Sequence, residues 1–88
     1  MQKLWSEKTW DDYLWWLWWQ RQDKKTLRRI NELIKSIERA DGKPMGKAEL
    51  LKGNLAGYQS VRIDRANRLT YTVQDGVLYL LRCRGHYE

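Results

Sequence analysis

The sequence predicts an α+β fold, in which two helices pack on one face of a largely antiparallel sheet of about four strands. Three observations support this: a possible short strand at residues 2–5, two helical patterns within residues 7–40, and alternating patterns after residue 58. Helices grouped ahead of a run of strands are typical of a helical layer that covers one sheet face. The 88 residues suffice for one core, so we expect a single domain spanning residues 1–88.

The first helix should begin after Ser6, because a serine is a favourable N-cap and Glu7 places a negative charge in the first turn. Helical spacing puts one apolar set on a single face, which we expect to form core: Trp10, Tyr13, Leu14, Leu17 and Trp18. Three further tryptophans fall on the opposite face: Trp15, Trp16 and Trp19. An exposed apolar patch of this kind usually marks a partner surface, and local packing on the following loop is the alternative.

Asp23 can cap a second helix, whose apolar residues recur every three or four positions: Leu27, Ile30, Leu33, Ile34 and Ile37. This helix should stop near Gly42, because glycine readily adopts the left-handed conformation that ends helices and Pro44 cannot continue one. The glycines and lysines of residues 42–47 match no P-loop spacing, so we interpret this segment as an ordinary connecting loop.

The remaining sequence predicts a β-meander. Alternation within residues 58–63 and 68–73 assigns one set of side chains to the core: Val61, Ile63, Leu69, Tyr71 and Val73. A three-residue loop at residues 74–76 would align Val73 with Val77 and extend the core face to Val77, Tyr79, Leu81 and Cys83. The opposite face would then be open and basic, with Arg62, Arg68, Arg82, Arg84 and His86.

Charge and composition restrict the kind of partner. Seventeen Lys and Arg against eleven Asp and Glu give a net charge of +6, which favours a polyanion such as RNA, or an acidic protein. The longest uncharged run that is mainly apolar, residues 13–20, is far shorter than the roughly 20 residues that cross a bilayer, so we expect no membrane span. With no signal-peptide pattern and Cys83 as the single cysteine, we predict a cytoplasmic protein without metal or cofactor.

The open basic face suits a phosphate backbone, because guanidinium groups bind phosphate oxygens in pairs and stabilise charge that develops in a transition state. Exposed strand arginines can also merely keep a sheet soluble, and the pattern alone leaves both interpretations open.

RNA cleavage without a metal needs one group to take the 2′-hydroxyl proton and another to protonate the 5′-oxygen. His86 could supply either, and since there is no second histidine, its partner would be a carboxylate or a weaker group. Glu49, just after the glycine-rich loop, is the candidate, although a single glutamate is more often an ordinary surface residue.

Several short blocks are distinctive when taken together: residues 5–7 (WSE), 10–14 (WDDYL), 30–35 (INELIK), 54–58 (NLAGY), 67–71 (NRLTY) and 83–87 (CRGHY). With them the chain resembles the YoeB family of toxins, in the RelE superfamily, over essentially its whole length. The resemblance implies a RelE-like fold and a ribosome-dependent mRNA endoribonuclease, an mRNA interferase, that inhibits translation. It implies messenger RNA, the ribosomal decoding site and an antitoxin of the YefM type as partners, and a homodimer is a further candidate.

The resemblance also assigns roles to individual residues. It implies that Glu49 is the general base, His86 the general acid and Arg68 the arginine that stabilises the transition state. Lys52 and Arg62 match positions that hold phosphate or organise the site, and Tyr87 matches a tyrosine beside the catalytic histidine. We add Arg84, from the predicted basic face, to the residues expected to bind RNA.

Two other functions stay open. A ParE-like relative would poison DNA gyrase by protein contact and need no acid–base pair, and the presence of Glu49, Arg68 and His86 together argues against it. An inactive relative would bind only RNA or an antitoxin. Departures from the family pattern keep this second alternative open: Leu50 stands where a proline is common, and the segment before Asp23 is longer and more aromatic.

Overall fold

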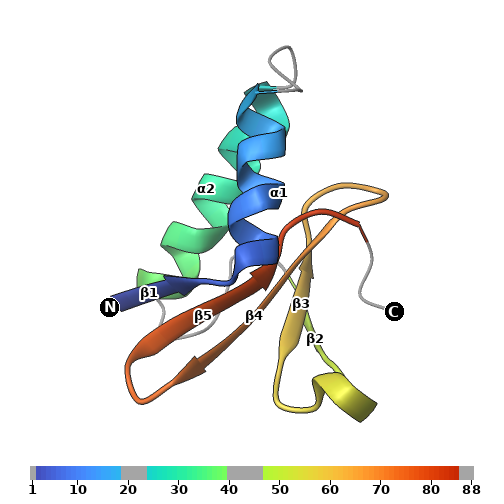
Figure 1. Cartoon of the computed structure of the whole chain (residues 1–88). Coiled ribbons are helices and arrows are strands. Elements are labelled where there is room, and N and C mark those ends of the chain that lie inside the picture. Colours follow the sequence, from blue (N-terminus) through green and yellow to red (C-terminus); the bar gives the residue numbers. More distant parts are fainter. Residues whose placement is uncertain (1, 19–23, 40–46, 86–88) are drawn as a thin grey trace.

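The computed structural model describes residues 2–18, 24–39 and 47–85, without the side chain of Trp18. Its elements are β1 (Gln2–Trp5), α1 (Glu7–Trp18), α2 (Lys24–Arg39), β2 (Ala48–Leu50), the 3-10 helix η1 (Gly53–Leu55), β3 (Gln59–Arg62), β4 (Arg68–Gln74) and β5 (Val77–Arg82). Within these residues the strands form a five-stranded sheet in the order β1-β5-β4-β3-β2, antiparallel except for the β1–β5 pair. The two helices stand side by side on one side of this sheet (Figure 1). The predicted α+β fold is confirmed, with β2 as an additional strand too short for alternation to reveal.

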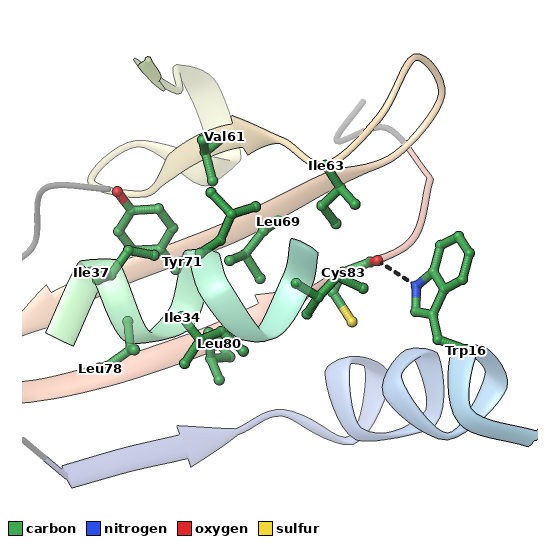
Figure 2. Packing of buried hydrophobic residues seen from close by; sticks show 12 residues of the cluster. Trp16, Ile34, Ile37, Val61, Ile63, Leu69, Tyr71, Leu78, Leu80 and Cys83 are labelled. Carbon is green, nitrogen blue, oxygen red and sulfur yellow. Dashed lines mark hydrogen bonds between the residues drawn. The ribbon is translucent and has the colours of Figure 1, made fainter. Parts of the chain in front are cut away.

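Helix α2 supplies most of the helical side of the core, as its spacing predicted. Its buried apolar side chains are Ile30, Leu33, Ile34 and Ile37, and Leu27 packs against the same cluster. Across from them lie apolar side chains of the sheet, among them Val61, Leu69, Tyr71, Leu78 and Leu80 (Figure 2). The predicted cap Asp23, the predicted end at Gly42 and the loop residues 42–46 lie outside the described residues.

Helix α1 begins as predicted but buries a different face. Ser6 caps it, since its Oγ accepts a hydrogen bond from the backbone N–H of Thr9 at 2.9 Å. Among the side chains of α1 that the structure describes, those of Thr9, Asp12 and Trp16 are buried. Trp10 and Leu17, expected in the core, are 49% and 43% exposed. Tyr13, also on the predicted face, does pack against the core cluster, so the predicted core face was wrong in part. The side chains that α1 buries most deeply include polar ones, which a hydrophobic pattern does not register.

The β4–β5 hairpin turns through two residues rather than the predicted three. Asp75 and Gly76 both have positive φ, 50° and 75°, as in a type I′ turn, and Val73 pairs with Leu78 instead of Val77. This one-residue difference reverses the expected faces of β5: Leu78 and Leu80 are buried, whereas the predicted core residues Val77, Tyr79 and Leu81 are half-buried.

A β-bulge near the end of β5 returns the residues after it to the sheet face that alternation predicted for them. Thr70 pairs with Arg82 while Tyr71 pairs with Leu80, so Leu81 is an extra residue in β5. Beyond the bulge Cys83 is buried in the core, as predicted.

The sheet face opposite the helices is less exposed to solvent than alternation predicted. Ser60 and Thr70 are fully buried on it, and Thr72 is nearly so. The connection between β2 and β3 covers part of this face, because the hydroxyl of Thr72 donates a hydrogen bond to the carbonyl oxygen of Gly57 at 2.8 Å. What stays open is the part of the face where charged residues lie.

Candidate functional site

A row of polar residues crosses four strands on the face opposite the helices. Glu49 in β2 pairs with Ser60 in β3, Ser60 pairs with Thr70 in β4, and Thr70 pairs with Arg82 in β5. Directly paired residues project to the same side of a sheet, so these four side chains share one face. Two small buried hydroxyl residues therefore form the floor between a carboxylate and a guanidinium.

Arg68 lies next to this row and forms an ion pair with Glu49. The distance from Arg68 Nη1 to Glu49 Oε1 is 3.7 Å, and the arginine side chain is only 15% exposed whereas that of the glutamate is 51% exposed. Arg68 also pairs in register with Arg62, so the two guanidinium-bearing residues lie side by side on one face of the sheet, and alternation had predicted this shared face. Like charges directly opposite each other are unfavourable in a sheet, so this arrangement is suited to an anion that lies between or above them.

An open pocket of about 300 Å³ lies at this position. The residues that line it are Arg29, Lys47, Glu49, Val61, Arg62 and Arg68. Four of these side chains are cationic and one is a carboxylate, so the pocket is strongly positive. Its volume is at the lower end of the range for small-ligand sites.

Sequence reasoning missed two of the pocket residues. Lys47 lies just ahead of β2 and two positions before Glu49, and this nearness in sequence was the only signal for it. Arg29 had no comparable signal, because several basic residues line the outer side of α2 and the sequence does not say which one faces β2.

Lys52 lies apart from this pocket. It is exposed in the connection that follows β2, where its carbonyl oxygen accepts a hydrogen bond from the N–H of Leu55 at 3.3 Å. The neighbouring Leu51 N–H donates to the carbonyl oxygen of Tyr58 at 3.0 Å, so both ends of the connection are held together.

The backbone near the C-terminus is fixed beside Arg68. The N–H of Arg68 donates to the carbonyl oxygen of Gly85 at 3.1 Å, and the N–H of Gly85 donates to Asn67 Oδ1 at 2.8 Å. Gly85 has a φ of 81°, in the left-handed region where a glycine is favoured. His86 and Tyr87 lie outside the described residues.

Arg84 contacts helix α1, which alternation along the strand did not predict. Its guanidinium carbon lies 4.4 Å from the centre of the Trp15 ring, a cation–π contact. Trp15 in turn meets the buried Trp16 edge to face, with ring centres 4.9 Å apart. The predicted outer tryptophan patch is therefore divided: Trp16 is core, Trp15 is half-buried under Arg84, and Trp19 lies outside the described residues.

Two titratable groups in the core have strongly shifted pKa values. Burial, reinforced by the Asp12 carboxylate, raises the pKa of the Cys83 thiol to about 12, and burial raises the pKa of Tyr71 to about 12. Cys83 is consequently a protonated thiol at neutral pH and a poor nucleophile.

Within the described ranges, no three His, Cys, Asp or Glu side chains are grouped so that they could bind a metal ion. The helices described here are also too short or too polar to cross a membrane.

Comparisons with known proteins identify relatives along the whole chain. A family model for the YoeB-like toxin of bacterial type II toxin–antitoxin systems matches residues 5–87. Toxin YoeB of Escherichia coli (strain K12) is 47% identical over 87 residues, 99% of this chain and 100% of the relative. The structure of the YoeB/ParE toxin from Agrobacterium tumefaciens has a TM-score of 0.85 and 39% identity, over 99% of this chain and 100% of that one. YoeB of Staphylococcus aureus, solved in a heterotetrameric complex with YefM and as a dimer, has a TM-score of 0.82 and 42% identity, over 99% of this chain and 98% of that one.

Proposed function

The chain belongs to the YoeB family of bacterial toxins, and from this premise we propose that it is an endoribonuclease that cleaves messenger RNA on the ribosome. The observation that carries the proposal is the ion pair between Glu49 and Arg68, at 3.7 Å, beside the positively charged pocket. It supports a site in which a carboxylate and a guanidinium act on the same phosphodiester. We propose that the protein does this in the cytoplasm, where ribosomes are.

The proposed reaction uses the 2′-hydroxyl of the RNA as the nucleophile. Glu49 takes the 2′-hydroxyl proton, the 2′-oxygen attacks the adjacent phosphorus, and the bond from phosphorus to the 5′-oxygen breaks. His86 donates a proton to that departing oxygen, so one proton is taken up and one released. Arg68 stabilises the negative charge that builds up on the phosphate oxygens. The products carry a 2′,3′-cyclic phosphate and a 5′-hydroxyl.

Other cationic residues would hold the RNA backbone. Arg62 adjoins Arg68 in register and lines the pocket, so it is the nearest candidate to bind the phosphate next to the scissile one. Lys52 and Arg84 would extend this contact to further phosphates along the RNA. Tyr87, which is not cationic, would add a contact beside His86. Phosphate contacts of this kind fix the position of the RNA, and the ribosome would supply the codon context.

We propose the same protein partners that the staphylococcal relative displays, an antitoxin of the YefM type and a second copy of the chain. The net charge of +6 favours an acidic antitoxin segment. An antitoxin that covers the open face would exclude RNA from Glu49 and Arg68.

The test is a cleavage assay with programmed ribosomes, using Glu49→Gln, Arg68→Ala and His86→Gln. Removal of a general acid or base costs about 10² to 10⁴ in rate, so the Glu49 and His86 variants should each lose about that much. Arg68→Ala should lose about 10² to 10³, as expected when a group that stabilises transition-state charge is removed. Mapping of the product ends should show a cyclic phosphate and a 5′-hydroxyl.

Glu32→Gln is a matched control, because Glu32 is an exposed glutamate of α2 away from the pocket lining. It should cleave at the wild-type rate, and thermal melting should show that all variants are folded. Wild-type cleavage by His86→Gln or Glu49→Gln would refute the mechanism. Toxicity without RNA cleavage by the wild-type protein would instead favour a toxin that acts by protein binding.

A further inference from the structure

Polar side chains of α1 follow the edge of β5 beyond the point where β1 ends. The last β1–β5 pair joins Trp5 to Leu80, and the N–H of Ser6 then donates to the carbonyl oxygen of Leu80 at 2.9 Å. From there side chains replace the backbone: Ser6 Oγ donates to the carbonyl oxygen of Leu81 at 2.7 Å, and Thr9 Oγ1 donates to that of Leu80 at 2.6 Å. The helix thus continues the pairing of β5 after the strand partner is gone.

The next two side chains in this series hold the peptide groups of Cys83. The backbone N–H of Cys83 donates to Asp12 Oδ2 at 3.0 Å, and its carbonyl oxygen accepts a hydrogen bond from Trp16 Nε1 at 2.9 Å (Figure 2). Both partners are buried, with Asp12 only 2% and Trp16 only 4% exposed. Residue 83 lies one position past the end of β5, so α1 alone supplies both contacts there.

The next two residues, Arg84 and Gly85, are also held in place, Arg84 by α1 and Gly85 by residues at the start of β4. Arg84 lies against the Trp15 ring of α1, and Gly85 is held by the backbone of Arg68 and the side chain of Asn67. Residues 83 to 85 are therefore held between α1 and the start of β4. The next residue in the chain is His86.

We propose that Asp12 and Trp16 are positioning residues, which fix the path of the chain into His86 by holding both polar groups of Cys83. The inference rests on the proposed function for what His86 does. A carboxylate buried in a helix–sheet contact is costly, and an apolar side chain would make that contact more simply. Lys8, the ion-pair partner of Asp12, is itself largely exposed, so the ion pair does not explain why Asp12 is buried. A directional contact to one peptide group is what the buried carboxylate provides.

The first test measures ribosome-dependent cleavage by Trp16→Phe, which keeps an aromatic ring but loses the N–H donor. Because misplacement of a catalytic group by about 1 Å can cost about 10²-fold, we expect kcat to fall about 10- to 100-fold with KM for ribosomes unchanged. Asp12→Ala should behave similarly. Asp12→Asn keeps an oxygen acceptor for the Cys83 N–H and should recover most of the rate.

Tyr13→Phe is the matched control on the same helix. It removes a 2.8 Å hydrogen bond from Tyr13 Oη to Asn31, which links α1 to α2 and does not touch the C-terminal segment. This variant should melt at a lower temperature and keep the wild-type kcat. If Trp16→Phe loses rate only in proportion to its unfolded fraction, so that its folded molecules keep the wild-type kcat, the positioning role is refuted.

A second measurement separates this inference from the proposed function. Amide hydrogen exchange of Arg84 and Gly85 should accelerate in Trp16→Phe, while exchange in β4 stays at the wild-type rate. If His86→Gln cleaves normally while this exchange accelerates, the proposed mechanism fails and the positioning of the backbone stands. If His86→Gln is inactive while Trp16→Phe shows normal exchange and normal kcat, the mechanism stands and the positioning role fails.

Discussion

Helices α1 and α2 pack on the same face of the sheet, α2 through apolar side chains and α1 largely through hydrogen bonds. The buried residues of α2 are one threonine and four aliphatic residues. In the described part of α1 they are a threonine, an aspartate and a tryptophan whose N–H is bonded to backbone. Apolar packing is non-directional and depends mainly on the area removed from water. Hydrogen bonds require specific partners, so α1 fixes the position of particular peptide groups in addition to covering the core.

The largest effect should come from the apolar helix. Leu33 is fully buried in α2, so Leu33→Ala should lower the free energy of unfolding by about 2 to 5 kcal/mol through lost burial and a residual cavity. Urea unfolding followed by circular dichroism measures this. Lys35→Ala, at an exposed position of the same helix, should change stability by less than about 0.5 kcal/mol. A small effect at Leu33 would mean that α2 contributes less to the core than its burial indicates.

A single polar contact of α1 should matter less, because folding replaces hydrogen bonds to water. Thr9→Val keeps the side-chain shape but loses the donor to the Leu80 carbonyl oxygen, and should cost about 0.5 to 1.5 kcal/mol. Thr9→Ser keeps the hydroxyl and is the control for its loss. If Thr9→Val were as destabilising as Leu33→Ala, the comparison between the helices would fail.

Alkaline pH should weaken the fold through Cys83, next to α1. The folded protein holds the thiol proton up to a pKa of about 12, whereas the unfolded chain releases it near 9. The folded state therefore binds more protons in this window, so stability falls as pH rises from about 9 to about 12. Tyr71, with a pKa of about 12 instead of 10, adds to the fall above pH 10.

The check on this pH effect is urea unfolding of Cys83→Ala at a series of pH values. The variant starts less stable at neutral pH but should lose stability less steeply between pH 9 and 10, where Tyr71 does not yet contribute. Parallel curves for the variant and the wild-type protein would show that the thiol does not titrate differently on unfolding.

The smallest effect should come from a polar contact on the surface. Lys3 Nζ lies 3.1 Å from Glu38 Oε1 and links β1 to the end of α2, with side chains 37% and 22% exposed. Exposed ion pairs contribute about 0 to 1 kcal/mol, so Lys3→Ala should change the unfolding free energy within that range, and less at high salt. If Lys3→Ala instead lowered the unfolding free energy by more than this, independently of salt, the Lys3–Glu38 pair would be as important as the buried contacts of α1.

Sequence patterns predicted the apolar helix well and the polar one poorly. Periodicity identified the core face of α2, but on α1 it favoured Trp10 over Thr9 and Asp12, because it counts hydrophobicity and not hydrogen bonds to a strand elsewhere in the chain. Alternation also failed in β5, where the turn length and the bulge at Leu81 each shift the register by one.

The candidate site was predicted in part. Alternation placed Arg62 and Arg68 on one face, and their pairing confirms it. Glu49 came from its place after the loop and from the family resemblance, since β2 is too short for a pattern. The contribution of Arg29 depends on how α2 is placed relative to the pocket, which is a tertiary arrangement that local sequence does not encode.

The parallel pairing of β1 with β5 has a consequence for how the chain folds during its synthesis. Strand β1 pairs with β5, and α1 bonds to backbone that follows β5, so β1 and α1 cannot complete these contacts until β5 has been made. Contacts this distant along the chain form late, after the cost of closing a long loop has been met. Under the proposed function, the nascent toxin cannot assemble the site next to β5 while this strand is still inside the ribosome that makes it, so the emergence of β5 sets the earliest point at which the toxin can act.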